Sequence, residues 1–191
     1  MSDNLAYQEE VREELIVGKI VAMSPRPTFN HNRVASRIYW MFESHLRGRR
    51  CTAIADGTDL YLTDEDRFVP DMMVVCDRDK IRRDGVHGAP DLVVEVLSPS
   101  TMRNDRMRKK EVYQACVVRE YWLVDTENRT IEQYLLQDGK LELNMVYASC
   151  RDDELERMSE QEKAELEAKF QCSLYSDFDI ALEDIFSGLL P

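Results

Sequence analysis

Residues 90–99 constrain the fold of this chain more than any other stretch. Their sequence, PDLVVEVLSP, is a short and almost wholly apolar run with β-branched residues, and it is bounded by prolines. Such a run predicts a central strand that is buried on both faces. Glu95 lies in the middle of the run, and a carboxylate in apolar surroundings must be paired, protonated or bound to a metal. We therefore interpret Glu95 as a candidate functional residue, with a buried structural ion pair as the alternative.

Length and composition favour one domain. The chain has 191 residues, of which 43% are hydrophobic, enough for a single core. We expect one domain over 1–191, with an N-terminal segment and hairpin in 1–27 and an acidic helical insertion in 151–170. No run reaches the roughly 20 apolar residues of a membrane span, and the polar N-terminus is unlike a signal peptide. The five widely spaced cysteines predict free thiols in a reducing cytoplasm.

The charge is strongly acidic but uneven. The net charge of −12 argues against a generally basic nucleic-acid-binding protein. Residues 103–110, however, carry five cations against one aspartate, whereas residues 152–167 are acidic. A local basic patch can bind phosphates within an acidic protein. We predict phosphate contacts, with a solvated helix face as the alternative, for Arg103, Arg106, Arg108 and Lys110.

Hydrophobic periodicity and turn signals give the expected order of elements. A hairpin pivots near Gly18, and a second hairpin turns at Asp138-Gly139. Helices are expected over residues 31–47 and 104–116, and an acidic helix opens with a capping box at Ser159 and runs to about residue 170. Strands are expected within residues 51–62, ending at residues 59–62, over residues 68–76, 91–97 and 120–125, and near residues 171–174, with a loop over 77–89 and a last helix near 180–186. The order αβββαβ from residue 31 to 125 is typical of an α+β fold with a mixed central sheet.

Two carboxylates on neighbouring predicted strands point to metal chemistry. Asp71 and Glu95 offer the hard oxygen ligands that Mg²⁺ or Mn²⁺ prefers. Such a metal can position a water molecule, lower its pKa and screen the charge of a phosphodiester. A nearby lysine could orient the nucleophile or stabilise the phosphate.

These motifs carry a family resemblance. Pro70-Asp71 followed by Glu95 on the next strand resembles the PD-(D/E)xK nuclease superfamily. Three further stretches are similar to the Uma-type family of restriction endonucleases: residues 90–101, Asp105-Arg106 with Lys109 and Tyr113, and residues 119–125 (REYWLVD). The similarity runs from about residue 13 to 187. It implies a restriction-endonuclease-like fold and metal-dependent cleavage of DNA phosphodiester bonds with Mg²⁺ or Mn²⁺.

The resemblance also implies site residues. Asp71, Glu95 and Lys109 would be catalytic, with the two carboxylates holding the metal. The superfamily places a lysine two residues after the glutamate, where this chain has Leu97, and the narrower family supplies one from the following helix at the position of Lys109. Successive helical residues point about 100° apart. We therefore expect Lys109, on the apolar stripe, to face the sheet and Lys110 to face away, with snorkelling of Lys109 to solvent as the alternative.

Three more residues form a second group of candidates. Asp91 shares a strand face with Glu95 by the alternation of side chains along a strand, and binding of loop amides is its alternative. His31 stands at the predicted helix start, where the family commonly has a histidine, and capping or packing is its alternative. Glu14 could reach the site from the N-terminal segment.

Three function classes stay open. The favoured one is a Mg²⁺-dependent DNA endonuclease, because a protein without catalysis has no reason to keep a costly buried carboxylate. The second is a nuclease-fold module that binds nucleic acid without cutting it. The third, which suits the acidic charge, is a metal-dependent phosphohydrolase acting on a small phosphate ester. We expect a symmetric homodimer, since twofold assemblies are the commonest closed ones.

Overall fold

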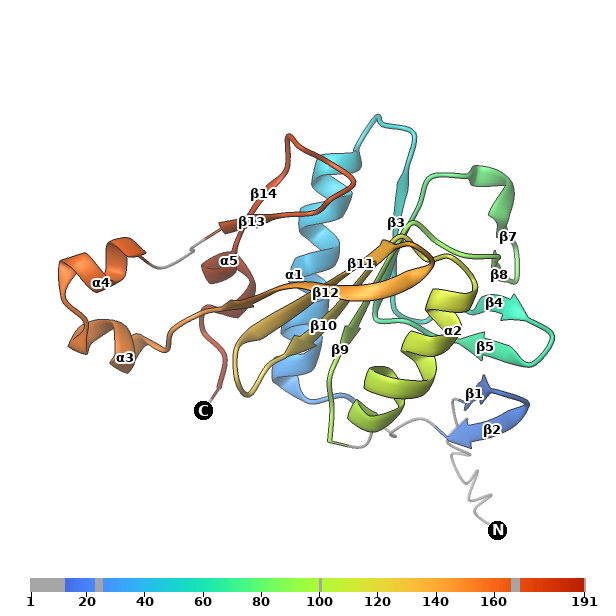
Figure 1. Ribbon diagram of the computed structural model, residues 1–191, viewed down its shortest axis with the longest axis horizontal. Helices are drawn as coiled ribbons and strands as arrows, with labels where there is room; N and C mark the ends of the chain where they lie inside the picture. Colours follow the sequence, from blue (N-terminus) through green and yellow to red (C-terminus); the bar gives the residue numbers. More distant parts are fainter. Residues whose placement is uncertain (1–12, 23–25, 100, 166–168, 191) are drawn as a thin grey trace, which may run out of the picture.

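A six-stranded mixed sheet forms the centre of the computed structural model, which describes residues 13–22, 26–99, 101–165 and 169–190 (Figure 1). The strand order is β12-β11-β10-β9-β6-β3. The bounds are β3 (Thr52–Ala55), β6 (Met72–Val75), β9 (Leu92–Val96), β10 (Glu120–Asp125), β11 (Thr130–Gln137) and β12 (Lys140–Ala148). Strand β9 pairs antiparallel with β6 and parallel with β10, so the expected mixed central sheet is confirmed.

Helices cover both faces of this sheet. Helix α1 (Phe29–Leu46) lies on one face, and the π-helix Asn104–Lys109 with α2 (Lys110–Ala115) lies on the other (Figure 1). Every residue of β9 is buried. Val94 packs in the core beneath α1, and Val93 packs in the second core beneath α2. The prediction of a central strand buried on both faces is therefore confirmed.

A second sheet was not expected from the sequence. Its order is β2-β1-β5-β4-β8-β7, with bounds β1 (Glu13–Ile16), β2 (Lys19–Ala22), β4 (Leu60–Thr63), β5 (Asp66–Phe68), β7 (Ile81–Arg82) and β8 (Gly85–His87). The strand expected to end at residues 59–62 is confirmed as β4. Residues 51–62 also contain β3, which was not expected; the chain turns at Gly57, whose φ is +94°, and β3 and β4 enter different sheets. The predicted loop 77–89 likewise contains the 3-10 helix Arg78–Lys80 and two strands.

The hairpin near Gly18 is confirmed as β1 and β2. Residues 1–12 and 23–25 of the expected N-terminal segment lie outside the described residues. Strand β1 also pairs with β5, which attaches this hairpin to the second sheet.

The C-terminal part differs from the prediction in its helices. The acidic helix expected after Ser159 is α4 (Glu160–Glu165), but it does not reach residue 170, because β13 begins at Lys169. A further short helix, α3 (Asp152–Arg157), precedes it, and both helices extend from one end of the molecule (Figure 1). The capping box is confirmed, because Ser159 and Glu162 exchange hydrogen bonds. The last segment of the chain completes the core beside α1. It consists of β13 (Lys169–Gln171), β14 (Asp179–Ala181) and α5 (Leu182–Phe186). Within the described residues, no helix is long and apolar enough to span a membrane.

The prediction of five free thiols is wrong. Cys51 and Cys76 form a disulfide, whereas Cys116, Cys150 and Cys172 are free. The cause is strand register: Thr52 pairs with Val75, so the flanking cysteines face each other at the end of the β3–β6 ladder. The cysteine pattern therefore gives no support to a reducing compartment.

Candidate active site

Strand register brings the two predicted metal ligands together. Met72 pairs with Val94 in the antiparallel β6–β9 ladder, so Asp71, one residue before β6, lies opposite Glu95. Directly opposed side chains have Cβ atoms about 5 Å apart. The Asp71 Oδ2 atom also accepts a hydrogen bond of 2.7 Å from the Val96 amide, which holds this carboxylate against β9.

Lys109 is buried at the centre of a cluster of carboxylates. Its residue is 2% exposed, and its Nζ lies 2.9 Å from Glu14 Oε1, 3.1 Å from Glu95 Oε1 and 3.2 Å from Asp105 Oδ1. Asp105 and Lys109 both come from the π-helix, where a spacing of four residues brings them to one side. Glu14 comes from β1. The structure therefore places Lys109 inward, beside Glu95, as expected.

Tyrosine and backbone donors complete this cluster. The Tyr113 hydroxyl donates to Glu95 Oε1 at 2.7 Å, so one glutamate oxygen receives bonds from both Tyr113 and Lys109. The Val69 amide donates to Glu14 Oε1 at 2.9 Å. These contacts hold each carboxylate in one orientation, and such preorganisation is what a catalytic or binding site needs.

Burial perturbs the titration of these groups. Burial raises the pKa of Glu95 well above its usual range, and the Lys109 charge opposes that rise, while Asp105, Asp71 and Glu14 add to it. Burial also raises the pKa of Asp105. For Lys109, burial lowers the pKa, but the surrounding carboxylates outweigh burial and raise it well above its usual value. Lys109 therefore stays protonated, and it is the cation that makes the buried acids tolerable.

A pocket of about 330 Å³ opens onto this cluster. The second-group candidate His31 lines it with Asp71 and Glu95, and His31 Nε2 lies 3.4 Å from Asp71 Oδ1. Burial lowers the pKa of His31, but the hydrogen bond and charge of Asp71 raise it to a value above the ordinary one. His31 is therefore available as a cation beside the carboxylates. Its backbone amide is bonded to Thr28, the N-cap of α1.

Asp91 lies outside this pocket. Although Asp91 and Glu95 share a strand face, four residues of a strand span about 13 Å. The Asp91 Oδ2 atom accepts a hydrogen bond of 2.8 Å from the Cys76 amide, and Oδ1 lies 3.4 Å from an Arg119 nitrogen. Asp91 therefore binds a backbone amide, which was the alternative to a role in the site, and it is not part of the candidate site.

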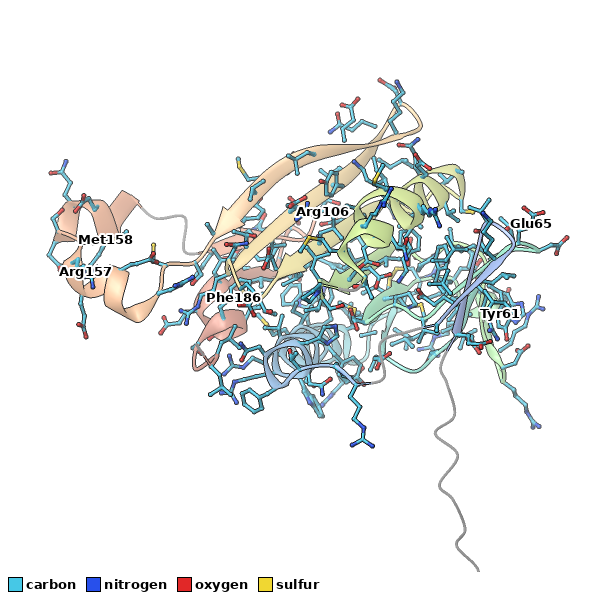
Figure 2. All side chains as sticks on the ribbon, turned by 90° about the horizontal axis from the view of Figure 1, so that it is seen from below. Tyr61, Glu65, Arg106, Arg157, Met158 and Phe186 are labelled. Carbon is cyan, nitrogen blue, oxygen red and sulfur yellow. A yellow bond between two sulfur atoms is a disulfide. The ribbon has the colours of Figure 1, made fainter. Side chains whose placement is uncertain are left out.

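The four predicted phosphate-binding cations divide into two pairs. Arg106 extends from the π-helix toward the β11–β12 hairpin (Figure 2), and one of its guanidinium nitrogens lies 2.6 Å from Glu132 Oε1 on β11. Lys110 Nζ lies 3.9 Å from the centroid of the Tyr134 ring. Burial lowers the pKa of Lys110. Arg103 and Arg108 are exposed, which makes these two the better placed to meet a phosphate.

Asp71 and Glu95 fit a divalent cation. Mg²⁺ is commonly held by one or two carboxylates, with water in its other positions, and both residues line the pocket. The charges of the pocket and the lysine cluster are also unbalanced: Glu14, Asp56, Asp71, Glu95 and Asp105 stand against Arg26, His31 and Lys109. In the part of the chain that the structure describes, no three His, Cys, Asp or Glu side chains are grouped to hold a metal, so water would complete the coordination.

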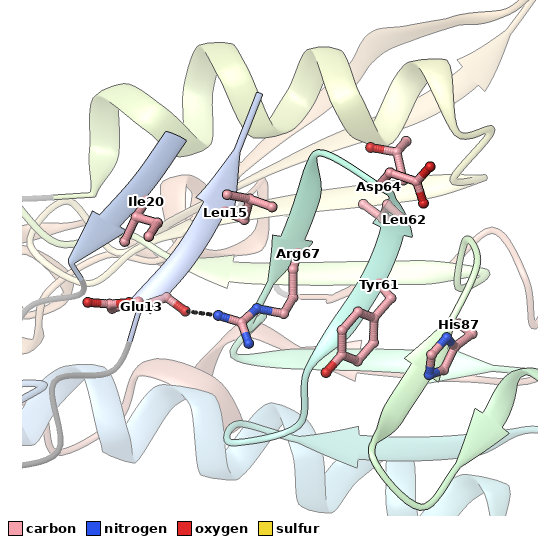
Figure 3. Close-up of a pocket in the computed structure, with 9 residues that line it drawn as sticks. Glu13, Leu15, Ile20, Tyr61, Leu62, Asp64, Arg67 and His87 are labelled. Atoms are coloured by element: carbon pink, nitrogen blue, oxygen red, sulfur yellow. Dashed lines mark hydrogen bonds between the residues drawn. The ribbon is translucent and has the colours of Figure 1, made fainter. Parts of the chain in front are cut away.

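A larger pocket, of about 640 Å³, lies on the outer face of the second sheet (Figure 3). Tyr61 and His87 stack there with ring centroids 4.6 Å apart, and Arg67 donates to the Glu13 carbonyl. Glu13 faces this pocket, whereas its neighbour Glu14 contacts Lys109 on the other side of β1. We place the candidate active site in the smaller pocket because the buried Glu95 and the buried Lys109 line it.

Comparisons with known proteins identify the family of this chain. A family model named Uma2, described as "Putative restriction endonuclease", matches residues 2–169. The chain belongs to the Uma2 family. The uncharacterized protein slr1290 of Synechocystis sp. (strain ATCC 27184 / PCC 6803 / Kazusa) is 31% identical to it over 138 residues, which are 70% of this chain and 72% of that protein.

A solved structure shows the same fold. It is the crystal structure of a "putative nuclease belonging to DUF820" from Anabaena variabilis ATCC 29413, which matches 93% of this chain and 91% of its own with a TM-score of 0.70 and 20% sequence identity. The restriction-endonuclease-like α+β fold expected for a Uma2 family member is therefore confirmed.

Sequence reasoning assigned no role to two members of the site, Asp105 and Tyr113. Each lies four residues from Lys109 along the chain, and residues four apart on a helix lie on the same side. That spacing could have identified both. Glu14 was a candidate from the N-terminal segment, and it reaches Lys109 from strand β1.

Proposed function

We propose that this Uma2 family protein is a divalent-metal-dependent endonuclease that hydrolyses DNA phosphodiester bonds, with Mg²⁺ or Mn²⁺ as its cofactor. The observation that carries the proposal is a Lys109 ammonium held 3.1 Å from Glu95, inside the pocket that Asp71 also lines. A structural core does not require a buried lysine among several acids, because apolar residues of similar volume are commonly as stable. A catalytic role therefore explains the Lys109 cluster better than a structural role does.

Each residue has a role in this proposal. Asp71 and Glu95 would hold the cation, which when bound supplies Lewis-acid activation of water and neutralises charge on the phosphate. Lys109 orients the attacking water or stabilises the developing negative charge with its ammonium group. Glu14 and Asp105 keep Lys109 protonated, and Tyr113 orients Glu95. His31, whose pKa is raised in the presence of Asp71, can donate a proton to the leaving oxygen.

Metal binding and cleavage together test the proposal. Calorimetric titration with Mn²⁺ should show binding to the wild type and strongly weakened binding to Asp71→Asn and Glu95→Gln. Glu95→Gln should also melt at a slightly higher temperature than the wild type without metal, because burial and the neighbouring carboxylates disfavour the charge of Glu95. The matched control for both variants is Asp91→Asn, a carboxylate on the same strand as Glu95 but outside the pocket, which should bind Mn²⁺ as the wild type does. An equal metal-induced rise in melting temperature for all four proteins would refute the metal assignment.

Substrate assays separate the alternatives. Cleavage of plasmid DNA that is lost in Asp71→Asn supports the endonuclease, whereas DNA binding without cleavage favours a binding module. A phosphohydrolase acting on small esters has some support in the net charge of −12 and in a pocket of only about 330 Å³. Hydrolysis of p-nitrophenyl phosphate with intact plasmid would favour that function.

A further inference from the structure

The solvent-facing side of α1 carries two exposed aromatic residues in one row. Phe29 is 54% exposed and Trp40 is 60% exposed. At about 100° per residue, the side chains of Phe29, Arg33, Trp40 and Arg47 project within a narrow sector of the helix surface. We call these four residues the α1 ridge. The opposite side of the helix packs in the core, so packing of the core does not explain the aromatic residues of the ridge.

The ridge belongs to a basic part of an acidic protein. Residues 29–50 contain five arginines and one glutamate, whereas the whole chain has a net charge of −12. Arg37 is bonded to the carbonyls of Ile185 and Ser187, but Arg47 is exposed. The Arg33 guanidinium carbon lies 5.7 Å from the centroid of the Phe29 ring. Cations beside exposed aromatic rings are what surfaces that bind single-stranded nucleic acid combine.

The ridge begins at the end of α1 that borders the candidate active site, although Phe29 and the pocket residue His31 project about 160° apart on the helix. Thr28 and His31 line the pocket, and Phe29 lies between them in the sequence. A helical rise of 1.5 Å per residue puts Trp40 about 16 Å beyond Phe29 along the helix. A strand that leaves the pocket and crosses the first turn of α1 would reach Phe29 first and Trp40 several nucleotides later.

We propose that the α1 ridge binds a single-stranded segment of the nucleic-acid substrate. Bases stack on Phe29 and Trp40, and phosphates lie beside Arg33 and Arg47. The inference rests on the proposed function, because the segment is part of the substrate of that site. A duplex keeps its bases stacked on one another, so exposed aromatic side chains favour unpaired bases. A limited basic row on one helix also suits a protein whose total charge opposes broad duplex contacts.

Tryptophan fluorescence can report this contact directly. The chain has two tryptophans, and Trp122 is fully buried, so a change at the surface comes from Trp40. The probe is an oligothymidylate of about twelve nucleotides, within the site sizes of single-strand-binding domains, added in EDTA to prevent cleavage. We expect quenching in the wild type and none in Trp40→Phe, whose emission comes from Trp122.

Affinity measured by anisotropy of the labelled probe gives a second readout. Trp40→Ala and Phe29→Ala should each weaken binding about five- to a hundredfold, which is the loss of one stacked base. The matched control is Leu143→Ala, because Leu143 is an apolar residue of similar exposure (51%) on β12, and its affinity should be that of the wild type. A duplex of the same length should bind more weakly than the single strand.

Three outcomes would overturn the inference. They are no binding of the probe, binding without a change in Trp40 emission, and wild-type affinity in Trp40→Ala. If sedimentation shows that Trp40→Ala removes a dimer while affinity is unchanged, the ridge is an interface between copies of the chain. None of these outcomes affects the proposed function, which stands or falls on whether Asp71→Asn abolishes metal-dependent cleavage.

Discussion

Replacing Lys109 with methionine removes the cation of the buried cluster and keeps most of its apolar stem. Three carboxylates, from Glu14, Glu95 and Asp105, lie within 3.2 Å of the lysine nitrogen, and the residue is 2% exposed. Removing one partner of a buried ion pair costs about 3–5 kcal/mol, because the other charge is left uncompensated. We expect a loss of this size in the free energy of unfolding of the metal-free protein near neutral pH.

The loss should depend on pH. Burial raises the pKa of Glu95 and of Asp105, and Lys109 lowers both, so its removal raises them further. A carboxyl whose pKa is higher in the folded state binds more protons when folded, and stability therefore falls as pH rises above the unfolded value of about 4.3. The deficit of Lys109→Met should therefore be smaller at about pH 5 than at about pH 8.

Urea unfolding at these two pH values measures the deficit. Lys110→Met is the matched control, because the neighbouring lysine lies over the Tyr134 ring on the surface and its loss should cost at most about 1 kcal/mol. Mn²⁺ should recover part of the deficit of Lys109→Met, since a bound cation replaces the missing charge. Equal stability of the two variants at the higher pH, or a deficit of Lys109→Met that does not change with pH, would refute the reasoning.

Three further predictions concern Tyr113, the exposed arginines of the π-helix region and the oligomeric state. Tyr113→Phe removes a hydrogen-bond donor to Glu95, so it should lower the free energy of unfolding by about 1.5–3 kcal/mol. It should also shift Mn²⁺ binding to higher pH, and a calorimetric pH profile equal to that of the wild type would contradict this role. Replacing Arg103 and Arg108 with glutamine should reduce the slope of log K against log salt by about 0.9 per phosphate contact on duplex DNA, whereas Arg106→Gln, whose residue is paired with an acid, should change the slope less. Sedimentation should show a symmetric homodimer, and a monomer at high micromolar concentration would count against it.

The central strand, the helix after it and the hairpin that follows could be predicted from the sequence, because each depends on residues that are close together in the chain. Glu95 stands out in an apolar run. Lys109 was identified through the family resemblance, and the apolar stripe of its helix predicted that it faces the sheet. The turn at Asp138-Gly139 is readable for the same reason.

What brings the site together depends on the tertiary structure. Glu14 meets Lys109 across 95 positions of sequence, because β1 joins a second sheet that no local pattern predicted. Asp91 and Glu95 share a face, yet only their separation along β9 and the position of the pocket exclude Asp91. Cys51 and Cys76 are joined by the register of two strands. Long-range pairing and register are decided by the packing of whole sheets, in which each strand's partner is chosen by burial of both faces and not by the strand's own residues.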